Sequence, residues 1–121
     1  MRRTRVYRDR HGIVAHSTSW IPREFAQAAP ELLRGERLQG GTSLDVIARA
    51  TGRQAVERDD ETAARVATSE DAALLELGAS GRHAILVLTA LFRDHVGQPL
   101  EYGVDLGAPG RTRVETSGVA L

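Results

Sequence analysis

Residues 82–106, RHAILVLTALFRDHVGQPLEYGVDL, decide the fold, because they contain two strand-like arms separated by a turn signal. The first arm, residues 84–92, carries large apolar side chains on both alternating faces of an extended chain. Such a strand needs cover on both sides, which predicts a place in the middle of a sheet or at a subunit interface. The return arm, residues 100–106, alternates apolar residues with a polar series that includes Glu101 and Asp105. Either these two carboxylates line a ligand pocket or they are solvated.

Turn and periodicity signals divide the rest of the chain into short elements. They predict, in order, a hairpin of residues 2–10 and 13–20, helical turns within 21–33, a helix over 42–51, a strand over 56–66, a short helix over 69–77 and a last strand over 111–119. With the central hairpin, this makes about six strands and three short helices. We therefore expect an α+β domain with an antiparallel sheet, occupying residues 1–121 as a single unit.

Composition excludes several classes of function. The 121 residues suffice for one domain, and the formal net charge of +0 argues against a nucleic-acid binder acting through its overall charge. The absence of cysteine excludes disulfides, thiolate nucleophiles and cysteine metal sites. No apolar run reaches the roughly 18 residues of a membrane-spanning helix, so we expect a cytoplasmic protein without membrane contact.

Few residues suggest catalysis. The four histidines lack the spacing of metal ligands, and Ser17 and Ser19 have neither a nucleophile elbow nor an evident His/Asp partner. Glu101 and Asp105, four residues apart on a strand, lie roughly 13 Å apart, too far for a close acid/base pair. We expect no enzymatic activity, no metal and no cofactor.

Two segments could bind an anion. Gly40 and Gly41 precede Thr42 and Ser43 at the predicted helix start, where free backbone N–H groups and two hydroxyls would converge. The alternative is an ordinary N-cap, with Asp45 completing a variant of the capping box. In the first strand, Arg3, Arg5 and Tyr7 share one face, which is either an anion site or a solvated edge strand.

The succession of short motifs resembles the UTRA domain, the effector-binding half of GntR/HutC-type bacterial transcription regulators. The matching pieces are SWIP at 19–22, GTSL at 41–44, the acidic helix at 69–77, FRDHVGQPLEY at 92–102 and RTR at 111–113. The resemblance implies a chorismate lyase-like fold that binds a small-molecule effector, such as a phosphorylated sugar or an organic acid. It further implies a homodimer that acts on DNA only through a separate winged-helix domain, which we do not expect within this chain.

The resemblance also implies a ligand-binding site. Carried over residue by residue, it consists of Arg5, Tyr7, Ser17, Thr42, Ser43 and Glu101. Tyr7 stands where the family has a second arginine, and Ser17 stands where it has a glutamate. A tyrosine that the family often carries near the end of the return arm is absent. These departures argue against a standard sugar phosphate as the ligand.

Two other functions stay open at this point. One is an enzyme of the chorismate lyase-like fold that acts on a small organic acid. The other is an oligomerisation module without a ligand. A turnover assay on chorismate would separate the first from an effector-binding domain, and a ligand screen would separate the second.

Overall fold

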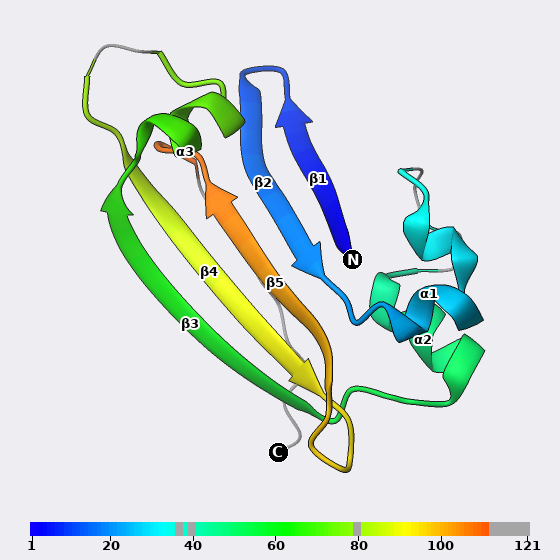
Figure 1. The fold of residues 1–121 in the computed structure, drawn as a ribbon. Helices are drawn as coiled ribbons and strands as arrows, with labels where there is room; N and C mark the ends of the chain where they lie inside the picture. The colour runs from blue at the N-terminus through cyan, green and yellow to red at the C-terminus, as the bar shows by residue number, and fades with distance from the viewer. Residues whose placement is uncertain (36–37, 39–40, 79–80, 112–121) are drawn as a thin grey trace.

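The computed structural model describes residues 1–35, 38, 41–78 and 81–111. Five antiparallel strands form one sheet in the order β1-β2-β5-β4-β3 (Figure 1). The strands are β1 Arg2–Asp9, β2 Gly12–Trp20, β3 Glu57–Val66, β4 Ala84–Arg93 and β5 Pro99–Gly107. The predicted α+β class with an antiparallel sheet is confirmed. The sixth expected strand, over residues 111–119, falls outside the described residues except for Arg111.

The hairpin of β4 and β5 supplies the middle of the sheet. β5 pairs with both β2 and β4, and β4 pairs in turn with β3, so the predicted interior position of the apolar arm is confirmed. The expected cover on both sides is not: along β4 only Ile85 is buried, and Leu86 remains 36% exposed. The neighbouring edge strand β3 is exposed at all ten positions, so among the described residues neither face of the sheet is covered at this edge.

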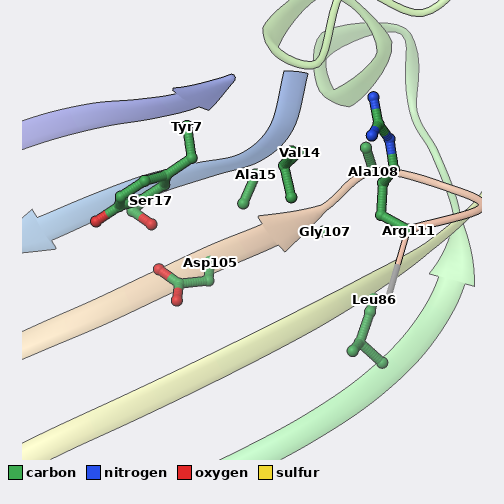
Figure 2. A pocket seen from close by; sticks show the side chains of 9 residues that line it. All are labelled: Tyr7, Val14, Ala15, Ser17, Leu86, Asp105, Gly107, Ala108 and Arg111. Carbon is green, nitrogen blue, oxygen red and sulfur yellow. The ribbon is translucent and has the colours of Figure 1, made fainter. Parts of the chain in front are cut away.

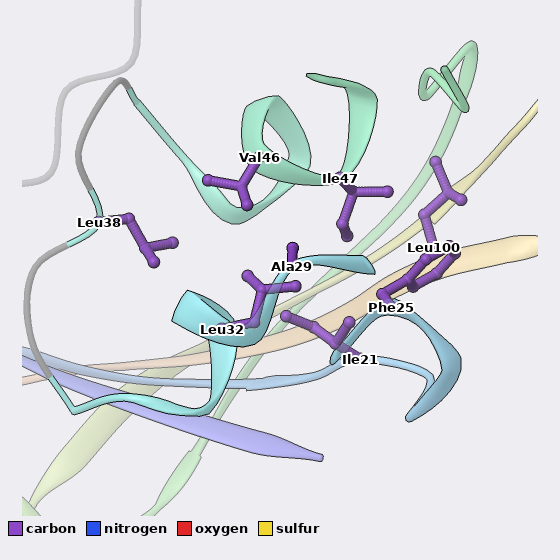
Figure 3. Packing of buried hydrophobic residues seen from close by; sticks show 8 residues of the cluster. All are labelled: Ile21, Phe25, Ala29, Leu32, Leu38, Val46, Ile47 and Leu100. Atoms are coloured by element: carbon purple, nitrogen blue, oxygen red, sulfur yellow. The ribbon is translucent and has the colours of Figure 1, made fainter. Parts of the chain in front are cut away.

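Three short helices lie together beside one end of the sheet (Figure 1). They are α1 Glu24–Ala28, the 3-10 helix η1 Pro30–Leu33 and α2 Ser43–Thr51. Apolar side chains from these helices and their flanking segments form a core with one residue of β5 (Figure 3). The buried members are Ile21, Phe25, Ala29, Leu32, Leu38, Val46, Ile47 and Leu100. We call these helices the helical cap.

Helix α2 has the boundaries that its sequence predicts. Thr42 accepts from the backbone N–H of Asp45, and the Asp45 side chain accepts from the backbone N–H of Thr42, completing a capping box. Gly52 ends the helix in the left-handed conformation, with φ of 75°, which glycine adopts without a steric penalty.

Helix α3 Ser69–Leu74 covers the sheet near the opposite end of β5 (Figure 1). It ends three residues before the predicted limit at residue 77, because Glu76 takes a left-handed φ of 55°. The N–H groups of Glu76 and Leu77 bond back to the carbonyls of Ala73 and Ala72, as in a Schellman motif. Leu75 then packs into a second core with residues from three strands and the segment after β5, namely Ile13, Ile85, Leu106 and Ala108. None of the described helices has the length and apolar character needed to cross a membrane.

Candidate functional site

Within the part of the chain that the structure describes, cavities of three kinds of lining hollow one face of the sheet. Strand register places Arg5, Ser17, Asp105 and Leu88 on this same face, because directly paired residues project to the same side. We call it the cavity face, and the opposite side, on which α3 packs, the α3 face. Asp105 lines all three cavities.

The cavity nearest the helical cap has a volume of about 170 Å³ and is lined by residues with polar side chains; we call it the polar cavity. Its lining residues come from β1, β2, β5 and the start of α2. They are Arg3, Arg5, Tyr7, Ser17, Ser19, Thr42, Ser43, Glu101 and Asp105. All six positions expected from the sequence therefore surround one hollow, although they are distributed over four segments of the chain.

The inner wall of the polar cavity is a contact between the helical cap and the sheet. Ser43 donates its hydroxyl to a carboxylate oxygen of Glu101, and both residues are buried, at 7% and 8% exposure. Ser43 is the first residue of α2 and Glu101 lies on β5. In this buried site the Ser43 hydroxyl is a hydrogen-bond donor to the Glu101 carboxylate. The same hydroxyl can instead donate to an oxygen of a bound ligand.

The environment of Glu101 favours its protonated form. Burial raises the pKa of the carboxyl, and the Ser43 hydroxyl and the positive charges of Arg5 and Arg3 only partly oppose this rise. Glu101 can therefore serve either as an acceptor or, when protonated, as a donor toward a bound molecule.

The two arginines of the polar cavity have different surroundings. One guanidinium nitrogen of Arg3 donates to the carbonyls of Leu32 at 2.7 Å and Arg34 at 2.8 Å, and so ties β1 to the end of η1. Burial lowers the pKa of Arg3, and the adjacent charge of Arg5 lowers it further. Arg5 is exposed, on the same face as Ser17 and Glu101, where its charge can face an incoming anion.

The start of α2 is an ordinary N-cap rather than an open anion cradle. The Asp45 carboxylate accepts from the Thr42 backbone N–H at 2.9 Å and from its hydroxyl at 3.1 Å. A side chain at Gly41 would overlap this carboxylate, because an added Cβ would lie 2.2 Å from the Asp45 Oδ2. Of the two hydroxyls at the helix start, that of Thr42 donates to Asp45 within the cap, and that of Ser43 reaches Glu101 on the sheet.

A second contact fixes the other end of α2. Arg53, which follows the helix, donates its Nε to Asp94 at 2.9 Å and stacks over the ring of Phe25 at 4.9 Å. Asp94 also accepts backbone N–H groups of Val96 and Gln98 within the β4–β5 turn. The helix is therefore attached to the central hairpin at both of its ends.

Three lining residues were not among the expected site positions: Arg3, Ser19 and Asp105. The sequence left open whether Asp105 lines a pocket or is solvated, and the structure places it half-buried in the lining of the cavities. The strand period could have identified all three, because each lies two or four positions from Arg5, Ser17 or Glu101 on the same strand and therefore on the same face. Among the residues that the structure describes, no three His, Asp or Glu side chains are grouped as ligands for a metal ion.

Fold and cavity together define the chain as an α+β domain with a polar cavity between an open sheet and a helical cap. The UTRA domain family matches residues 1–112, and the chain belongs to this family. Sequence comparison with curated proteins gives no significant match.

Solved structures with this fold include transcription regulators. A GntR-family regulator from Enterococcus faecalis V583 is 17% identical, with a TM-score of 0.74 over 97% of this chain and 79% of that one. The C-terminal domain of the histidine utilization repressor from Pseudomonas syringae pv. tomato is 17% identical, with a TM-score of 0.68 over 95% and 75%. The possible transcriptional regulator YydK from Bacillus subtilis is 15% identical, with a TM-score of 0.68 over 95% of this chain but 48% of its own. Family and fold together support an effector-binding regulatory domain.

Proposed function

We propose that this domain binds a small acidic effector in the polar cavity and thereby controls a separate winged-helix DNA-binding domain of a GntR/HutC-type regulator. The observation that supports this most is the buried Ser43–Glu101 contact, which lines a cavity facing the Arg5 guanidinium. An acid can accept from Arg5 and Ser43 and share a proton with Glu101.

The proposed signal starts at the same contact. A ligand that replaces the Glu101 carboxylate as the partner of Ser43 changes what holds the start of α2 against β5. The ligand then shifts the equilibrium between two arrangements of the helical cap and the sheet. The size of this shift, and so of the effect on DNA binding, is set by the difference in the ligand's affinity for the two arrangements. We propose that these arrangements alter the relation between two copies in a cytoplasmic homodimer, and so the spacing of the attached DNA-binding domains.

A thermal-shift screen with phosphorylated sugars, organic acids and small lactones tests the proposal. A compound that binds only the folded state adds about 2.7 kcal/mol of stability at a hundred times its dissociation constant, which raises the melting temperature by several degrees. The proposal predicts hits among the acids that are lost in Arg5→Ala. An oligomerisation module without a ligand would give no hit in any compound class, and release of pyruvate from chorismate would identify an enzyme instead.

A further inference from the structure

The polar cavity continues along the sheet into a larger, mainly apolar cavity of about 340 Å³, which we call the apolar cavity. The two share Tyr7, Ser17 and Asp105 as lining residues, so they are neighbouring compartments of one groove over β1, β2 and β5. Figure 2 shows Tyr7, Ser17 and Asp105 toward one end of the apolar cavity and Ala108, Arg111 and Leu86 toward the other.

Small and aliphatic residues create the space at the far end of the groove. Val14, Ala15, Gly107, Ala108 and Leu86 line it. Gly107 contributes no side chain to this part of the sheet surface, although a Cβ added there would fit, in ordinary contact at 3.5 Å with the Cβ of Leu86.

The charged residue at the far end already has a partner. Arg111 lines the apolar cavity, but its guanidinium forms an ion pair with Asp9. Charge available to a ligand is thus concentrated at the opposite end of the groove, around Arg5 and Glu101. The groove is polar at one end and apolar at the other.

The volumes of the two cavities indicate whether a ligand would occupy the polar cavity alone or the whole groove. Ligand pockets of proteins commonly measure about 300–1,000 Å³, whereas the polar cavity measures about 170 Å³ and the apolar cavity about 340 Å³. The polar cavity alone has room for a head group, and the apolar cavity has room for a larger apolar portion joined to it.

We propose that the effector is an amphiphilic acid, with its acidic head between Arg5 and Ser43 and its hydrocarbon tail lying along β2 and β5 into the apolar cavity. This inference rests on the proposed function and specifies the class of ligand for the same site. Each methylene that enters the apolar cavity raises the affinity about fourfold, which corresponds to about 0.8 kcal/mol per buried CH₂ group.

Calorimetry with acetate, butyrate, hexanoate and octanoate on the full chain measures this dependence on tail length. We expect the affinity to rise with each step until the apolar cavity is filled. A variant that fills the apolar cavity, Ala15→Leu, is expected to lose this gain in affinity with tail length. The matched control is Ala63→Leu on β3, an exposed residue outside the lining of either cavity.

The outcomes separate the inference from the proposed function. Equal affinity for all four acids, abolished by Arg5→Ala, would overturn the inference and leave the proposed function standing. Binding of none of the four acids would overturn the inference, and the proposed function would then be decided by the thermal-shift screen, which also contains phosphorylated sugars and lactones. If circular dichroism shows that Ala15→Leu folds poorly, the wild-type measurements still test the inference. Wild-type affinities that do not change with tail length would by themselves exclude a buried tail.

Discussion

Ser43, at the first position of α2, donates its hydroxyl to the Glu101 carboxylate on β5, 58 positions further along the chain. The contact is buried, and it joins the helical cap to the central strand of the sheet inside the polar cavity. The same two side chains therefore contribute both to the stability of the cap and to the proposed binding of an effector.

Removal of the Ser43 hydroxyl tests the structural part of this account. Ser43→Ala leaves a buried carboxylate without one of its donors, so we expect the free energy of unfolding to fall by about 1–3 kcal/mol in urea denaturation. In a double-mutant cycle with Glu101→Ala, the two changes should be non-additive, because either one removes the same contact.

The chain contains a matched control for Ser43→Ala. Ser69 is the first residue of α3 and follows a threonine cap, as Ser43 does in α2, but it is exposed. Ser69→Ala should change the free energy of unfolding by no more than about 0.5 kcal/mol. Equal effects of the two substitutions would mean that the Ser43–Glu101 contact contributes nothing beyond the position at a helix start.

The charge of Arg5 is expected to act on the ligand. Arg5→Ala should weaken binding of an acidic effector by about 1–3 kcal/mol in calorimetry, because a charge-assisted hydrogen bond is lost. Arg2→Ala is the matched control, since Arg2 is on the same strand but projects to the α3 face. A loss of similar size in both variants would indicate attraction by overall charge rather than a specific contact.

The raised pKa of Glu101 predicts a dependence of stability on pH. The folded protein holds this proton to higher pH than the unfolded chain, whose carboxyl titrates near 4.5. Stability therefore falls as the pH rises from about 4.5 through the folded-state pKa, because the folded state binds more protons over that interval.

Glu101→Gln removes this titration. Wild type loses stability over this interval and the variant does not, so the free energy of unfolding of Glu101→Gln minus that of wild type should increase as the pH is raised from 4 to about 8 in parallel urea titrations. A difference between the two proteins that is constant across this range would show that burial does not perturb the Glu101 carboxyl.

Local signals in the sequence predicted most of the elements. The capping residues Thr42 and Asp45 with Gly52 define α2, and the alternation of the return arm predicts a strand with one apolar face, which is β5. α3 was predicted too long. Its end depends on Glu76 adopting a left-handed conformation, which glycine and asparagine adopt more readily than glutamate does.

The sequence could name part of the lining of the polar cavity, but it could not give the arrangement of these residues. The family resemblance named Arg5, Ser43 and Glu101, and the structure gathers them around one cavity. Periodicity shows which residues share a face, but it does not show which elements cover that face. The burial of Glu101 and the position of Asp105 follow from how the helical cap and the strands assemble, which depends on contacts between residues far apart in the chain.

The most direct test of the central claim is a titration of the isotopically labelled domain, observed by amide NMR, with the acid that gives the largest thermal shift. Binding in the polar cavity predicts that the largest changes in chemical shift occur at Arg5, Ser43 and Glu101. Changes confined to the α3 face, around the exposed ring pair of Trp20 and Tyr102, would contradict the account.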